Sequence, residues 1–136
     1  MKFSVRNDTI CHYLQDMAKH DEYWAYRFVA KHGRAFGPKQ PLPKGVRRGP
    51  MQYCYSSAWN LTRVRKELVY VEGFARAILG VGKDGYADDH IDAHAWVVNA
   101  NGEVIDPTWP HGIEYFGIPF KREYVDKMMP RLKVQG

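Results

Sequence analysis

The sequence has no long apolar run and few cysteines, and both features narrow the class of protein. No stretch approaches the about 20 consecutive apolar residues of a membrane-spanning helix. The first residues, MKFSVRNDTICHYLQ, lack the apolar run of a secretory signal. We therefore expect a cytoplasmic protein with no membrane segment. Its two cysteines, Cys11 and Cys54, are then expected to remain reduced thiols.

Acidic residues are fewer than basic ones, 15 against 20, which gives a formal net charge of +5. Such a surplus favours acidic partners, including nucleic acid. Much of it lies in the segment from Lys31 to Arg48, which is rich in proline and glycine and is expected to be a surface loop without regular structure. The residues that suit phosphate binding or base stacking there are Lys31, Arg34, Phe36, Lys39, Lys44, Arg47 and Arg48.

The sequence does contain enough apolar bulk for a core. Of its 136 residues, 45% are hydrophobic and 14% are aromatic, which excludes a disordered composition. The length is that of one ordinary domain, and no internal repeat divides it. We expect a single domain over residues 1–136.

Hydrophobic spacing predicts three helices. The first is expected to be capped within residues 7–9 and to run to about residue 31. Its apolar face consists of Ile10, Leu14, Met17, Trp24 and Phe28. A second helix is expected over 54–67 and a last one over 121–129.

Three segments have the composition of strands, namely 68–75 (LVYVEGFA), 93–98 (AHAWVV) and 103–106 (EVID). The last two flank Asn99-Ala100-Asn101-Gly102, which is typical of a hairpin turn. The stretch 80–90 (GVGKDGYADDH) is expected to be an exposed loop. Helices and strands together predict an α+β fold.

Cys54 lies where a nucleophilic thiol is expected. It follows a Gly-Pro break and begins the second helix, where unpaired N–H groups and the helix dipole lower a thiol pKa. Cys11 falls inside the first helix and has no such assistance. We therefore expect Cys54 to react much faster than Cys11 with an alkylator below the pKa of about 8.5 of free cysteine.

His94 and Asp106 lie on the two strands of the expected hairpin. If Gly102 is left-handed, Val98 faces Val104. His94 then lies diagonal to Asp106 on one face, and a register one residue earlier places the two directly opposite. Either register brings imidazole and carboxylate together. A carboxylate on one ring nitrogen leaves the other to face a thiol, which is the logic of Cys-His-Asp catalysis.

These residues carry a resemblance to a known family. HAWVVNANGEVIDPTW is similar to the transglutaminase-like pattern of His-Ala-Trp, a strand, and a second strand that ends in Asp-Pro-Thr. QYCYSSAWNLTRV resembles the nucleophile helix of that superfamily, and YVEGFA looks like the strand between them. The resemblance covers residues 52–109. It departs from the family at Gln52-Tyr53-Cys54-Tyr55, where members often have Gly-Gln-Cys-Trp.

The resemblance implies a papain-like or transglutaminase-like core, with the nucleophile helix packed on a small antiparallel sheet and an added N-terminal helix. It implies Cys54 as nucleophile, His94 as base and Asp106 as the residue that orients His94, with no cofactor. The residues expected to bind the oxyanion or the substrate are Gln52, Tyr55, Trp96 and Trp109.

The implied activity is acyl transfer on a protein or peptide amide through a thioester, as in a cysteine protease or amidase, a deamidase or a transglutaminase. These reactions differ in the acceptor that reaches the acyl group. Small phage and bacterial proteins with this arrangement look similar, which suggests modification of a cellular target, in the host cytoplasm if the chain is phage-encoded. Asp106→Asn is expected to leave the fold largely intact while it reduces turnover strongly.

Two other classes remain open. His90, Asp92 and His94 alternate along an extended segment and would place three metal ligands on one face, as in a metal-dependent hydrolase. Asp88 and Asp89 add carboxylates to that segment. The basic loop fits a nucleic-acid-binding or protein-binding module without catalysis. Activity that needs no metal would favour the thiol enzyme over the first of these alternatives.

Overall fold

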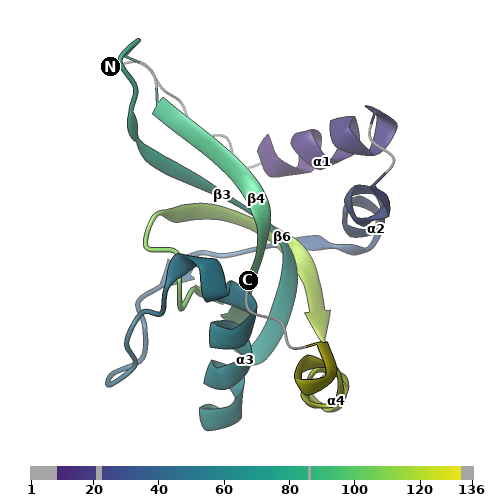
Figure 1. Cartoon of the computed structure of the whole chain (residues 1–136), viewed down its shortest axis with the longest axis vertical. Coiled ribbons are helices and arrows are strands. Elements are labelled where there is room, and N and C mark those ends of the chain that lie inside the picture. The colour runs from purple at the N-terminus through teal and green to yellow at the C-terminus, as the bar shows by residue number, and fades with distance from the viewer. Residues whose placement is uncertain (1–8, 21–22, 86, 133–136) are drawn as a thin grey trace.

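The computed structural model describes residues 9–20, 23–85 and 87–132, and the fold is α+β. The helices are α1 (Thr9–His20), α2 (Trp24–His32), α3 (Cys54–Val64) and α4 (Arg122–Leu132), with a short 3-10 turn η1 (Met51–Tyr53) before α3. The strands are β1 (Arg34–Phe36), β2 (Lys39–Gln40), β3 (Val69–Val81), β4 (Ala87–Val98), β5 (Val104–Ile105) and β6 (Gly112–Phe120). Figure 1 shows the long strands β3 and β4 side by side, with α1 and α2 at one end of the molecule and α3 and α4 at the other. No helix in these ranges is long and apolar enough to cross a membrane.

The strands form one six-stranded sheet in the order β1-β6-β3-β4-β5-β2. Among the described strands, β2 and β5 pair in parallel and all other neighbours are antiparallel. β1 and β2 belong to a single stretch, residues 34–40, interrupted at Gly37 and Pro38. One short stretch therefore supplies both edges, so the sheet has to curl back on itself.

The curled sheet separates three apolar clusters. Side chains along a strand alternate between faces, so Tyr70 and Phe74 of β3 face outward and Val71 and Ala75 face inward. Outside, α1 and α2 cover Phe74, and α3 and α4 cover Tyr70. The inner cluster contains Val71, Ala75, Ala77, Trp96, Val98, Val104, Trp109 and Tyr115. His94 and Trp96 share a face of β4, so His94 belongs to the inner side.

The prediction of a single N-terminal helix is wrong, because α1 ends at His20 and α2 begins at Trp24. The expected capping residues Asn7 and Asp8 lie outside the described residues. The second helix begins at Cys54, as predicted, and ends at Val64, because Arg65 is already extended. The last helix occupies 122–132 instead of 121–129.

The strands differ more from expectation than the helices do. β1 and β2 lie in the segment that was expected to have no regular structure, and they exist through pairing with the distant strands β6 and β5. β3 and β4 continue past their predicted ends to Val81 and from Ala87, so much of the expected loop over 80–90 is strand. β5 is shorter than predicted, and β6 was not predicted at all.

Gly73, in the middle of the sheet, gives the first prediction. A Cβ at this position would lie 2.2 Å from the carbonyl oxygen of Phe116 and 2.4 Å from the Cα of Gly117. Gly73→Ala therefore has to push β6 away from β3. We expect the free energy of unfolding, measured by urea denaturation, to fall by about 1–3 kcal/mol.

The control is Val64→Ala at the exposed end of α3, which should change the free energy of unfolding by less than about 0.5 kcal/mol. If Gly73→Ala lost no more free energy of unfolding than this control, the protein would not have β6 as close to β3 as described.

Candidate active site

Cys54 is the first residue of α3 and is 4% exposed, packed against Ala95 of β4. Burial raises the pKa of its thiol to about 11, against the opposing effect of a backbone hydrogen bond from Ala95. The helix start is where the sequence predicted it, but the expected lowering of the thiol pKa is wrong, because desolvation outweighs the N–H groups. The thiol is therefore protonated at neutral pH and needs a proton acceptor to become a nucleophile.

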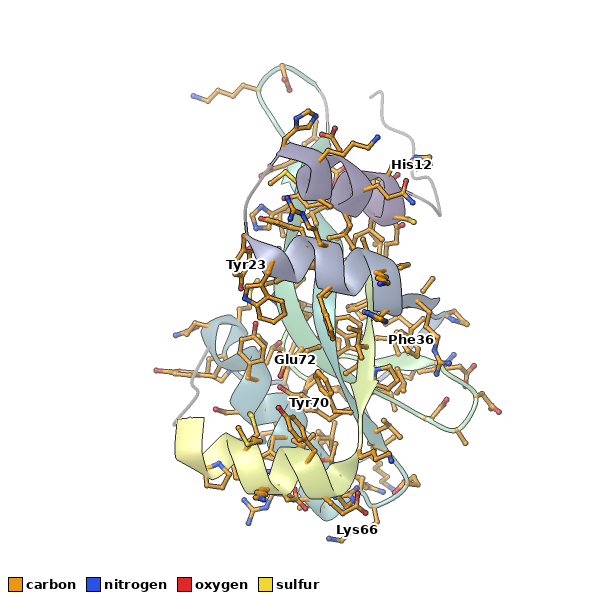
Figure 2. The ribbon with its side chains drawn as sticks, turned by 90° about the vertical axis from the view of Figure 1, so that its right-hand side faces the viewer. His12, Tyr23, Phe36, Lys66, Tyr70 and Glu72 are labelled. Carbon is orange, nitrogen blue, oxygen red and sulfur yellow. The ribbon has the colours of Figure 1, made fainter. Side chains whose placement is uncertain are left out.

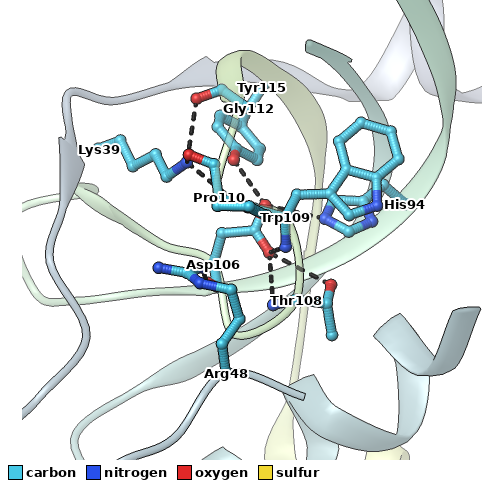
Figure 3. A network of polar contacts seen from close by, with 9 residues as sticks. All are labelled: Lys39, Arg48, His94, Asp106, Thr108, Trp109, Pro110, Gly112 and Tyr115. Atoms are coloured by element: carbon cyan, nitrogen blue, oxygen red, sulfur yellow. Dashed lines mark hydrogen bonds and ion pairs between the residues drawn. The ribbon is translucent and has the colours of Figure 1, made fainter. Parts of the chain in front are cut away.

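His94 is the neighbouring residue of β4; it faces the inner side of the sheet, away from Ala95, and it lines the same cavity as Cys54. Val98 pairs with Val104 and Gly102 has a φ of +75°, so the hairpin adopts the first of the two expected registers. His94 Nε2 lies 2.9 Å from Asp106 Oδ2, and both side chains are completely buried (Figure 3). His94 Nδ1 has no hydrogen-bond partner among the described residues.

Asp106 accepts hydrogen bonds with both carboxylate oxygens (Figure 3). Oδ1 accepts the backbone N–H groups of Thr108 at 3.0 Å and Trp109 at 2.9 Å. Oδ2 accepts the phenol of Tyr115 at 2.5 Å in addition to its contact with His94. Burial by itself would raise the pKa of this carboxyl, but the His94 pair, the Trp109 N–H and the Tyr115 hydroxyl together hold it below its ordinary value.

This donor shell indicates that Asp106→Asn, which is expected to leave the fold largely intact, also lowers its stability. The new carboxamide nitrogen is itself a donor, and both positions open to it face donors. The carboxamide has one acceptor oxygen in place of two, so at least one buried hydrogen bond would be lost, which costs stability.

Two basic residues of the Lys31–Arg48 segment fix the turn that carries Asp106. Arg48 Nη1 donates to the Asp106 carbonyl oxygen at 2.7 Å. Lys39 Nζ donates to the carbonyl oxygens of Trp109, Pro110 and Gly112 at 3.0, 2.9 and 3.2 Å (Figure 3). Lys39 and Arg48 thus act as internal cross-links, while five of the six basic residues of the segment are exposed, as expected for a surface loop: Lys31, Arg34, Lys44, Arg47 and Arg48.

Gly49 joins the same turn to the nucleophile helix. Its N–H donates to the carbonyl oxygen of Pro107 at 2.7 Å. It also touches α3 so closely that a Cβ would lie 2.6 Å from Ser57 Oγ. The segment before η1 therefore holds the Asp106 turn at a fixed position relative to Cys54.

Cys54 and His94 line one cavity of about 410 Å³ together with Gln52 and Trp109. The Trp109 indole stacks on the His94 imidazole with ring centroids 4.1 Å apart. The other residues lining this cavity are Met51, Ala77, Leu79, His90, Asp92, Ala93 and His111. Of the expected site residues, the structure thus gathers Cys54, His94, Gln52 and Trp109 around one space.

Trp96 and Tyr55 do not line this cavity. Trp96 is fully buried in the inner cluster, where it meets Tyr115 edge to face. Tyr55 is half-buried and packs against the cluster beneath α3. Neither side chain therefore forms part of the cavity wall.

The ligands required by the metal alternative are engaged elsewhere. His90 Nε2 and Asp92 Oδ2 form an exposed pair at 3.0 Å, while Asp106 holds His94 Nε2. Asp89 pairs with Arg76 at 2.7 Å. Within the described residues, no group of three His, Cys, Asp or Glu side chains is arranged to hold a metal ion.

Sequence reasoning missed two polar residues near the site. Tyr115 lies on the unpredicted strand β6, and no local pattern indicated that its hydroxyl would reach Asp106. Glu72 accepts a hydrogen bond from the Tyr70 hydroxyl at 2.8 Å, and burial raises the pKa of its carboxyl (Figure 2). A single acidic residue within the apolar run LVYVEGFA was a signal that would have identified Glu72.

Tyr115→Phe tests how the donor shell holds Asp106. Because the folded-state pKa of Asp106 is lowered, its ionisation contributes stability that is present above the unfolded pKa of about 3.9 and is lost as pH falls through the folded value. Removing the Tyr115 donor raises that folded value. We expect the free energy of unfolding at pH 7 to fall by about 1.5–3 kcal/mol, and the loss to shrink as pH approaches 2.

The measurement is urea denaturation at several pH values, with the exposed Tyr124→Phe as the control. A loss for Tyr115→Phe that is equal at every pH would mean that the phenol acts through packing alone.

Comparison with protein-family models, with curated proteins and with solved structures finds no match to this chain. What the protein does therefore has to be inferred from the chemistry of the site itself.

Proposed function

We propose that this protein is a cysteine-dependent acyl-transfer enzyme that acts on an amide, with Cys54 as nucleophile, His94 as base and Asp106 as the group that orients the base. One observation carries the proposal. Cys54 and His94 line the same cavity, and Asp106 occupies one imidazole nitrogen while the other has no partner among the described residues. A papain-like or transglutaminase-like core is part of the proposal, supported by the chain order of a helix that starts at the cysteine, then the histidine strand, then the aspartate turn.

The first step follows from the raised thiol pKa. The neutral thiol gives its proton to His94 Nδ1 as Sγ forms a bond to the carbonyl carbon of the amide. Nε2–H donates to Asp106 Oδ2, so the carboxylate stabilises the imidazolium without taking its proton. The imidazolium then protonates the amide nitrogen, the C–N bond breaks, and a thioester to Cys54 remains.

The second step regenerates the thiol. His94 removes a proton from a water molecule or an amine as this molecule attacks the thioester carbon. The C–S bond then breaks, the acyl product leaves as an acid or a new amide, and His94 returns the proton to Sγ. Hydrolysis, deamidation and transamidation share these steps and differ in the leaving and entering groups. Trp109 covers one face of the imidazole and limits the access of water to it.

The oxyanion is assigned to the Gln52 side-chain amide and the Cys54 backbone N–H. Gln52 is exposed, belongs to η1 directly before the nucleophile, and lines the cavity. Donors arranged before the reaction stabilise the charge that develops on the carbonyl oxygen.

An electrophilic probe tests the nucleophile and the base. At pH 7, a peptidyl chloromethyl ketone should add once to the intact protein, on Cys54. The adduct should persist in Cys11→Ala and disappear in Cys54→Ala, with intact-protein mass spectrometry as the measurement. His94→Ala should slow alkylation by about 10² or more, since general-base assistance contributes 10²–10⁴.

Circular dichroism has to show that His94→Ala is folded, and EDTA should leave the alkylation rate unchanged. Equal labelling of the two cysteines in the folded protein would contradict the proposal. Loss of activity with a chelator and recovery with zinc would instead support the metal-dependent alternative at His90, Asp92 and His94.

Asp106→Asn tests the orienting group. The rate of alkylation should fall by about two orders of magnitude or more, since the same change in a related triad costs about 10⁴. The free energy of unfolding should also fall, by about 1–3 kcal/mol, because a buried hydrogen bond is lost. Tyr115→Phe serves as the matched control because it weakens the same donor shell and keeps the carboxylate, so it should slow alkylation much less. A near wild-type rate in folded Asp106→Asn would reduce the site to Cys54 and His94.

A further inference from the structure

The cavity that contains Cys54 and His94 has a lining suited to a particular kind of side chain. Its walls beyond the reacting groups are largely apolar, from Met51, Ala77 and Leu79. Asp92 is the single carboxylate in the lining, and no lysine or arginine occurs there. The lining also contains His90 and His111, so Asp92 is its only side chain with a permanent charge at neutral pH, in a chain with a net charge of +5.

Asp92 is placed at a defined distance from the reacting groups. It lies two residues before His94 on β4 and therefore on the same face, about 7 Å along the strand. Its side chain is 61% exposed. Oδ2 meets His90 Nε2 at 3.0 Å, and Oδ1 accepts the Ala93 N–H at 3.2 Å, which leaves lone pairs on both oxygens for a further donor.

We propose that the cavity selects an amide substrate whose acyl residue carries a long aliphatic cation, such as a lysine or arginine side chain. This inference rests on the proposed function, because the scissile carbonyl is placed between Cys54 and His94. The stem of such a side chain lies along the apolar walls, and its charged end reaches Asp92. The four-carbon stem of lysine spans about the separation between His94 and Asp92.

The charge on Asp92 should matter more than the shape of the walls. A norleucine side chain fills the same apolar space without charge, and a glutamate side chain brings a like charge towards Asp92. Partly exposed ion pairs contribute modestly, so we expect a preference for lysine over norleucine of about fivefold or more at low salt. The preference should decrease in 0.5 M sodium chloride, because salt screens an exposed pair.

The experiment compares three N-blocked dipeptidyl chloromethyl ketones that end in lysine, norleucine or glutamate. In each, Sγ of Cys54 forms a bond to the methylene carbon, chloride leaves, and the thiol proton passes to His94. The second-order rate of adduct formation is measured on the full chain by intact-protein mass spectrometry. The wild-type order should be lysine, then norleucine, then glutamate.

Three variants connect the preference to one carboxylate. Asp92→Asn should bring the lysine-to-norleucine ratio close to one, and Asp92→Lys should make glutamate the preferred probe over lysine. Asp88→Asn removes the same charge from an exposed position of β4 outside the cavity and should keep the wild-type ratio. The ratio within each variant is the readout, so a general change in reactivity cancels.

The outcomes separate this inference from the proposed function. If no probe labels Cys54, both are overturned. If all three label Cys54 at similar rates in the wild type, or if Asp92→Asn keeps the wild-type ratio, the cation preference is overturned and the thiol enzyme stands. If Asp88→Asn loses the preference as fully as Asp92→Asn does, the general charge of β4 is responsible and the assignment to Asp92 is overturned.

Discussion

The candidate site depends on one buried anion, the carboxylate of Asp106. An ionised carboxylate that is 1% exposed is tolerated only when hydrogen bonds replace its lost water. Here the replacements come from three parts of the chain: the backbone after the turn, the phenol of Tyr115 on β6, and the imidazole of His94 on β4. The hydrogen bonds that stabilise this one carboxylate therefore also fix the turn, the position of β6 and the orientation of the proposed base.

The same carboxylate acts on both proposed reacting groups. It fixes the orientation of the His94 imidazole through the Nε2–Oδ2 contact, and, as a smaller effect beside burial, it raises the pKa of the Cys54 thiol. At rest the cavity therefore holds a neutral thiol and an imidazole fixed in one orientation, and in the proposed mechanism the thiolate forms only as the proton moves. A preformed thiolate at a helix start would need much weaker desolvation than Cys54 experiences. In this respect the proposed mechanism resembles that of enzymes in which a general base deprotonates a hydroxyl nucleophile during the attack. It differs from that of enzymes that hold a thiolate–imidazolium ion pair before the substrate binds.

The sequence predicted the parts of the site that depend on local chemistry. The Asn99–Gly102 turn sets the hairpin register, and the register brings His94 to Asp106, which lies twelve residues later in the sequence. The features that the sequence did not predict depend on contacts between segments that are distant in the chain. β1 and β2 are too short to form without β6 and β5, and β6 is interrupted by glycine and proline, so neither Tyr115 nor the curl of the sheet was visible. The pKa of Cys54 was mispredicted for the same reason, since the burial that raises it comes from β4 and not from its own helix.

The basic segment shows how misleading a charge count can be when the partners of the charges are unknown. Lys39 and Arg48 donate hydrogen bonds to backbone carbonyl groups around the Asp106 turn. Part of the surplus of positive charge is thus a structural requirement of the site, and the other basic residues of the segment are exposed on the surface. Beyond about 8 Å at physiological salt, that surplus is screened. A substrate inside the cavity therefore responds mainly to the nearest lining groups, and the carboxylate among them is Asp92. The proposed preference for a cationic side chain therefore depends on the carboxylate in the cavity wall and not on the net positive charge of the protein.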